Sequence, residues 1–197
     1  MELIDEEVEV GGRTLRLLRP PQADELIDEA AFDEDEFLPY WAELWPSGLA
    51  LADAVARLEL RGLRVLELGA GLGLPSLVAA LCGAEVLASD WAAEAVELLE
   101  LNAERNGIAL RAARVRWDEP EPLLAEAPWG LVLGADLLYE RRNADVLLDL
   151  LPRLGPDVLL ADPSRLFAKG FFEQAGPRWE VTTEVAGTVN LHRLRLR

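Results

Sequence analysis

The sequence is poor in the residues that build metal sites and disulfide bonds. It contains one cysteine, Cys82, and one histidine, His192, so it has neither paired cysteines nor a histidine cluster. Cys82 lies among apolar residues and is interpreted as a small buried side chain, while a single histidine on an expected strand is more often structural than catalytic. We therefore predict no metal site and no internal disulfide bond.

Long apolar runs are also absent. No run approaches the roughly 18 residues that cross a membrane, and the first ten residues, MELIDEEVEV, are acidic where a secretory signal would be basic and then apolar. A chain of 197 residues, 51% of them apolar, suits one domain with a buried core. We expect one cytoplasmic domain over residues 1–197 with no membrane contact, in which residues 1–62 (a small hairpin and helices) pack on a core of residues 63–197.

Basic residues are outnumbered, since 36 acids against 19 Lys and Arg give a net charge of -17. This charge argues against a nucleic-acid partner, because such partners are bound by neutralising phosphates. A basic surface, such as a lysine-bearing surface of another protein, would instead be attracted. Solubility alone is the competing explanation, and it applies equally to the eight acids within residues 24–36, which form either a solvated face or a substrate-steering segment. The sequence gives no sign of the oligomeric state.

Short apolar runs closed by glycine or an acid predict buried parallel strands, namely RVLELG (64–69), AEVLASD (84–90), GLVLGAD (130–136) and DVLLADP (157–163). Helix-length segments separate them, which indicates crossovers on a doubly wound sheet. Residues 114–117, RVRW, are also strand-like, and the last 20 residues alternate apolar and polar residues around the turn AGT. We predict an α/β fold with a doubly wound, mostly parallel seven-stranded sheet and an antiparallel C-terminal hairpin.

The region before the first of these strands is less regular. VEVGGRTLRLL predicts a small hairpin that turns at Gly11 and Gly12. SGLALADAVARL predicts a helix that Ser47 caps.

Three glycines, Gly69, Gly71 and Gly73, follow the first strand and precede a helix, so backbone N–H groups and the helix start can approach a ligand closely. Asp90 ends the next strand, where a carboxylate can accept hydrogen bonds from both hydroxyls of a ribose. This combination predicts a nucleoside site. A dinucleotide is disfavoured, because the third glycine of its fingerprint would fall on Leu74 or Ser76.

Val65 to Gly73, with Glu67, resembles motif I of class I methyltransferases, which bind S-adenosylmethionine. With YWAELWPSGLALA, SDWAAEAVELLELNAERNG and GADLLYE, the chain from about Tyr40 onward is similar to the seven-strand protein-lysine methyltransferases, the branch that modifies chaperones and the electron-transfer flavoprotein beta subunit. The segment ADPSR (161–165) is similar to an Asp-Pro-Gly-Arg segment of the flavoprotein-modifying members, with Ser164 in place of glycine. The resemblance implies cofactor contacts from Trp45, Gly69, Ala70, Gly71, Asp90, Trp117 and Ala135. Gly73 is expected to bind the cofactor with the rest of the turn. Glu67, at the end of the first strand, is expected to brace the glycine turn or to bind the charged end of the cofactor.

The resemblance also assigns Asp136 and Tyr139 to the family's Asp-x-x-Tyr motif, and with it a catalytic role. Asp136 would accept hydrogen bonds from the substrate amine, and Tyr139 would line the lysine channel. The competing interpretation of Asp136 is a cap for the helix that starts near Arg141. Trp45 and Trp117 have a packing interpretation as well, while Trp41 and Trp91 are treated as structural.

The function expected from the sequence is therefore an S-adenosylmethionine-dependent methyltransferase that modifies a lysine side chain of a protein. Two alternatives stay open: a small-molecule N-methyltransferase of the same fold, and a non-catalytic cofactor-binding module whose acidic surface recruits a partner.

Overall fold

The computed structural model describes residues 2–21 and 40–197. The acidic cluster of residues 24–36 lies outside the described residues. Within the described ranges, no helix is long and apolar enough to span a membrane.

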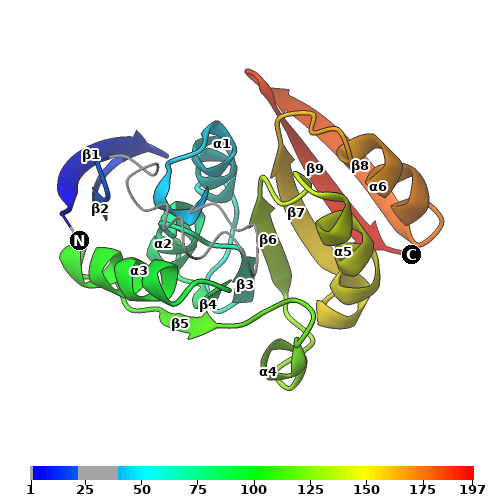
Figure 1. Ribbon diagram of the computed structural model, residues 1–197, viewed down its shortest axis with the longest axis horizontal. Coiled ribbons are helices and arrows are strands. Elements are labelled where there is room, and N and C mark those ends of the chain that lie inside the picture. The colour runs from blue at the N-terminus through cyan, green and yellow to red at the C-terminus, as the bar shows by residue number, and fades with distance from the viewer. Residues whose placement is uncertain (1, 22–39) are drawn as a thin grey trace, which may run out of the picture.

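The centre of the fold is a seven-stranded sheet in the order β5-β4-β3-β6-β7-β9-β8 (Figure 1). Strands β3 to β7 pair in parallel, whereas β9 pairs antiparallel with both β7 and β8. This arrangement confirms the predicted fold class. The strands are β3 (Arg64–Leu68), β4 (Glu85–Asp90), β5 (Arg111–Arg114), β6 (Leu131–Ala135), β7 (Asp157–Asp162), β8 (Trp179–Ala186) and β9 (Val189–Leu196).

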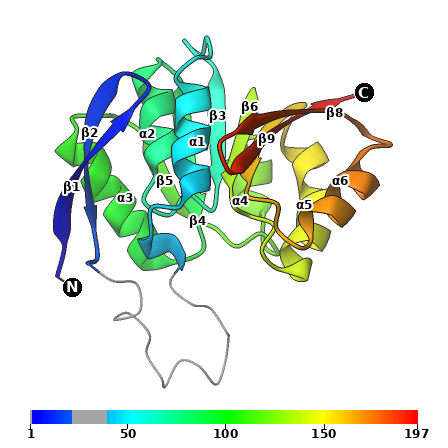
Figure 2. The ribbon, with the colours of Figure 1, turned by 90° about the horizontal axis from the view of Figure 1, so that it is seen from above.

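Helices cover both faces of the sheet (Figures 1 and 2). Alternate residues of the central strands enter two buried clusters, with Val65 in one and Leu66 in the other, which explains why these strands are apolar throughout rather than alternating. One cluster includes α1 and α2, and the other includes α4, α5 and α6. The helices are α1 (Pro46–Val55), α2 (Leu74–Leu81), α3 (Ala93–Arg105), α4 (Glu121–Leu124), α5 (Arg141–Leu154) and α6 (Ala168–Ala175).

The N-terminal strands β1 (Ile4–Val10) and β2 (Arg13–Arg19) form a separate antiparallel hairpin. It turns through Gly11 and Gly12, whose φ angles of 57° and 71° suit a tight hairpin turn. The side chain of Asn102, on α3, binds both the backbone N–H and the carbonyl of Leu18, so the hairpin is fastened to the helix beside it.

Two local predictions were wrong. Ser47 does not cap α1, because the helix already begins at Pro46 with Trp45 in the cap position, and proline needs no N–H partner at the first turn. The Ser47 hydroxyl is instead buried, and it has no hydrogen-bond partner among residues 2–21 and 40–197. The strand expected at residues 114–117 ends at Arg114, so Trp117 lies in the loop after β5.

Candidate active site

A cavity of about 350 Å³ lies where β3, β4 and β6 end. Its lining comes from the loops that follow these strands, from the start of α1 and from the loop after β7. All the residues predicted for the cofactor and for catalysis line it: Trp45, Glu67, Gly69, Ala70, Gly71, Gly73, Asp90, Trp117, Ala135, Asp136 and Tyr139. Their spatial grouping agrees with one site, whereas their individual roles stay predictions.

The glycine turn between β3 and α2 has a backbone that requires glycine. Gly69, Gly71 and Gly73 have φ angles of 59°, 51° and 79°. A Cβ atom on Gly71 would lie 3.0 Å from the carbonyl oxygen of Trp41, and one on Gly73 would lie 2.7 Å from Cγ of Leu99. A side chain at either position would collide with these neighbours, so the turn borders the cavity with bare backbone.

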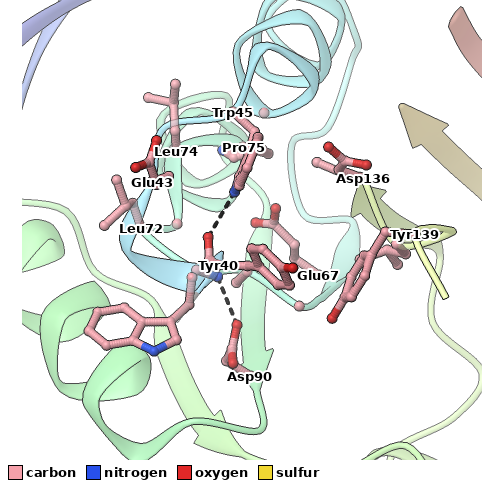
Figure 3. A pocket seen from close by; sticks show the side chains of 18 of the residues that line it. Tyr40, Glu43, Trp45, Glu67, Leu72, Leu74, Pro75, Asp90, Asp136 and Tyr139 are labelled. Carbon is pink, nitrogen blue, oxygen red and sulfur yellow. Dashed lines mark hydrogen bonds between the residues drawn. The ribbon is translucent and has the colours of Figure 1, made fainter. Parts of the chain in front are cut away.

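Asp90 is the last residue of β4 and is 4% exposed. Its carboxylate accepts hydrogen bonds from the backbone N–H groups of Gly71 (2.9 Å) and Ala92 (3.0 Å), so it fixes the glycine turn to the neighbouring strand (Figure 3). Burial raises the pKa of this carboxyl group, and the backbone hydrogen bonds oppose the shift. A carboxylate has about four lone-pair positions, so Asp90 retains acceptor capacity for ribose hydroxyls.

Glu67, on β3, is buried below the turn. It accepts a hydrogen bond from the hydroxyl of Ser76 on α2, and its backbone carbonyl accepts one from Ser89 (2.8 Å). Glu67 thus connects β3, α2 and β4 beneath the cavity. Burial raises the pKa of its carboxyl group to about 8, with a smaller contribution from the charge of Asp90.

This shift makes stability depend on pH. The folded protein keeps the Glu67 proton up to about pH 8, whereas the unfolded chain loses it near the ordinary value of 4.5, so folding stability falls as the pH rises between these values. Between pH 5 and pH 8, this group should lower the free energy of unfolding of the wild type by something on the order of 3 kcal/mol. Glu67→Gln cannot ionise, so we expect it to lack this decrease. Urea unfolding at several pH values measures it.

The control for this experiment is Glu85→Gln, which removes an exposed carboxylate from the start of β4. Its unfolding free energy should follow the wild-type pH dependence. Parallel curves for wild type and Glu67→Gln across this range would contradict a buried, protonated Glu67.

Aromatic side chains from separate segments meet on one side of the cavity (Figure 3). The centroid of the Tyr40 ring lies 5.4 Å from the centroid of the Tyr139 ring and 6.1 Å from that of the Trp45 ring. Both pairs have an edge-to-face arrangement. The Trp45 indole N–H donates to the Tyr40 carbonyl at 2.7 Å, which fixes the segment that enters α1. Burial raises the pKa of the Tyr139 phenol, so this hydroxyl stays protonated at neutral pH.

Two further tryptophans lie at the cavity. Trp41 and Trp91, for which the sequence predicts a structural role, also line it. The available signal was their position, because Trp91 directly follows Asp90 at the end of β4 and Trp41 lies within the segment that enters α1.

Asp136 directly follows β6 and is 8% exposed. Its backbone is in the left-handed region (φ 56°), and its N–H donates to the carbonyl of Ala161 at 2.7 Å. The helix-cap interpretation was wrong, because α5 begins at Arg141 with Glu140 in the cap position and no side-chain cap. The Asp136 carboxylate instead forms a two-point ion pair with Arg165, which the sequence analysis left without a role.

The sheet order and this cavity at the strand ends define a class I methyltransferase fold. The chain belongs to the lysine methyltransferase family, whose model matches residues 32–167. Over 153 residues it is 35% identical to histone-arginine methyltransferase METTL23 of Xenopus laevis, covering 73% of this chain and 64% of that protein. Over 136 residues it is 37% identical to the electron transfer flavoprotein beta subunit lysine methyltransferase of the same species (64% and 53%).

A third relative, protein N-lysine methyltransferase METTL21A of Danio rerio, is 34% identical over 120 residues, which is 57% of this chain and 55% of that protein. The chain thus matches between about half and just under two thirds of the length of these relatives.

Among solved structures, the Thermus thermophilus 16S rRNA methyltransferase RsmC superposes with a TM-score of 0.70 over 99% of this chain and 51% of its own, at 21% identity. Magnesium protoporphyrin IX methyltransferase from Synechocystis superposes with a TM-score of 0.61 over 87% and 94%, at 17% identity. At these identities the likeness concerns the fold alone.

Proposed function

We propose that the protein is an S-adenosylmethionine-dependent methyltransferase that modifies the side-chain nitrogen of a lysine in another protein. The observation that carries this proposal is the placement of two groups of residues in one cavity. The glycine turn and Asp90 provide a nucleoside cradle, and Asp136 and Tyr139 lie in the same cavity. Membership of the lysine methyltransferase family supports the same reaction.

The residues of the cavity fit this cofactor. The glycine turn borders the cavity with bare backbone, and the Asp90 carboxylate has acceptor capacity for ribose hydroxyls. Trp91 and Trp117 line the same cavity, and their apolar rings suit a purine base. When bound, S-adenosylmethionine supplies a methyl group activated on a sulfonium sulfur.

Asp136 and Tyr139 act on the amine in this proposal. The amine must be uncharged, because its nitrogen lone pair would form the new bond to the methyl carbon. The lysine ammonium would first release a proton to solvent. The electron pair of the broken carbon–sulfur bond would stay on sulfur, and the product would be a methylammonium group. The carboxylate of Asp136 orients the amine by accepting hydrogen bonds from it, while the rings of Tyr139 and Tyr40 exclude water from the channel.

The net charge of -17 favours a substrate protein with a basic, lysine-bearing surface and disfavours nucleic acid. A cytoplasmic location and the lack of membrane contact remain predictions from the sequence. Arginine is a second candidate acceptor, because the match to the histone-arginine methyltransferase METTL23 covers 73% of this chain.

Labelling a cell lysate tests the proposal. The protein is incubated with lysate and tritiated S-adenosylmethionine, labelled proteins are found by gel fluorography, and acid hydrolysis separates methyllysine from methylarginine. Label in protein methyllysine is the expected result. Label only in the small-molecule fraction would indicate a small-molecule enzyme, and cofactor binding without any label would indicate a binding module.

The chain offers a convenient internal control. Lys169 is its one lysine, and its side chain is 87% exposed. Lys169→Arg therefore removes every lysine on which the enzyme could label itself, so that remaining methyllysine belongs to the substrate.

A further inference from the structure

Arg165 holds Asp136 by a two-point ion pair inside the cavity. Its Nε–H donates to Asp136 Oδ1 at 2.7 Å and its terminal N–H donates to Oδ2 at 2.8 Å. The Asp136 side chain is 8% exposed and that of Arg165 is 38% exposed. The guanidinium carbon also lies 5.9 Å from the centroid of the Trp45 ring, within the range of a cation–π contact.

The backbone on both sides of this pair has an unfavourable conformation. Asp136 and Ser164 are the two non-glycine residues with positive φ in the described ranges, at 56° and 68°. The turn after β7 is held by the Arg165 N–H, which donates to Asp162 Oδ1 at 2.8 Å, and by Asn190, which donates to the Ser164 hydroxyl at 2.9 Å. Such strain is typical of functional sites, and here it directs Arg165 back toward β6.

The ion pair changes what Asp136 offers to a substrate. A carboxylate has about four lone-pair positions, and the fork of Arg165 uses one on each oxygen, so two remain for an amine. The charge of the pair is balanced, so Asp136 attracts an ammonium group far less than a lone carboxylate would. A nearby guanidinium also favours the uncharged form of an amine, since like charges repel.

We propose that Arg165 is a positioning residue that neutralises and orients Asp136, so that the acceptor pocket holds the substrate amine in its uncharged, nucleophilic form. This inference rests on the proposed function. The other ionisable side chains that line the cavity are Tyr40, Glu43, Glu67, Asp90, Tyr139 and Glu140, and Asp162 lies beside Arg165 at the end of β7. The counter-charge of Asp136 in this proposal is Arg165, so the test changes Arg165 alone.

The first test needs no acceptor protein. Sinefungin carries a primary amine in place of the transferable methyl group, whereas S-adenosylhomocysteine carries no charge there, so the ratio of their dissociation constants reports how well the pocket receives an ammonium group. Calorimetry at pH 7 should show that Arg165→Gln and Arg165→Met each shift this ratio toward sinefungin by about tenfold, since a nearby positive charge is removed.

Two further variants complete the comparison. Arg165→Lys retains the charge and should stay close to wild type, within about threefold. Arg153→Gln removes a surface arginine that pairs with Asp149 on α5, and it should leave the ratio unchanged. Ratios for both neutral Arg165 variants within about twofold of wild type would overturn the proposal, and testing two of them guards against one failing to fold.

The second test uses a protein labelled in the lysate experiment. In Arg165→Gln the acidic limb of the pH profile of kcat should shift to higher pH by about one unit, because the unpaired Asp136 then stabilises the ammonium form of the substrate lysine. Arg165→Lys should restore the limb. A purely structural role would lower kcat equally at every pH, and that result would overturn the proposal. Failure of the wild type to label any protein would instead count against the proposed function, while the sinefungin ratio would still decide the role of Arg165.

Discussion

Replacing Asp136 with alanine is expected to abolish methyl transfer while cofactor affinity stays within a few fold of wild type. The side chain lies outside the glycine turn and Asp90, so the nucleoside cradle is retained. What is lost is the group that orients the amine, and we expect kcat to fall by at least about 10³-fold. Calorimetry with S-adenosylmethionine and single-turnover transfer of tritiated methyl measure the two quantities.

The backbone of Asp136 determines the controls. Alanine is disfavoured at φ 56°, whereas glycine is not, so Asp136→Gly removes the carboxylate without that strain. The two variants should lose the same activity even if they differ in thermal stability. Asp149→Ala, an exposed change on α5, should stay fully active. Lost cofactor binding combined with a normal rate for the remaining complex would contradict the role assigned to Asp136.

The main features of the fold could be predicted from local sequence. Apolar runs that end in glycine or an acid identified the central strands, because a strand covered on both faces must be apolar throughout. The proximity of Gly71 to Asp90 could be predicted for a related reason. Gly71 lies in the turn after β3 and Asp90 ends β4, and the carboxyl ends of neighbouring parallel strands share one edge of the sheet.

Contacts between distant segments could not be predicted in this way. Arg165 lies 29 residues from Asp136 in the sequence. The turn that carries Arg165 includes Ser164 in a left-handed conformation, which is uncommon for serine and has no signal in the sequence. The sequence of the segment Asp-Pro-Ser-Arg does not identify the partner of its arginine. The pairing with Asp136 depends on β6 and β7 being neighbours in the sheet. The position of Trp91 against the cavity likewise depends on side-chain direction after β4, and aromatic residues there pack more often than they bind.

The second large effect concerns Asp90. We expect Asp90→Ala to weaken S-adenosylmethionine binding by at least about 100-fold, because hydrogen bonds to a charged acceptor contribute roughly 1.5 to 3 kcal/mol each and two ribose hydroxyls would lose theirs. The same change leaves the backbone N–H groups of Gly71 and Ala92 without their acceptor, so the glycine turn also loses its anchor to β4. Calorimetry measures the affinity, and thermal unfolding of the free protein measures the structural part.

Asp90→Asn separates the two contributions. An asparagine keeps one carbonyl oxygen to accept from the backbone and loses the charge and the second acceptor, so it should bind more weakly than wild type and more tightly than Asp90→Ala. Asp145→Ala, which removes an exposed acid from α5, should bind as wild type does. If Asp90→Ala still bound the cofactor within about fivefold of wild type, the adenosine would lie away from the β4 carboxylate, and the assignment of the glycine turn to this ligand would be wrong.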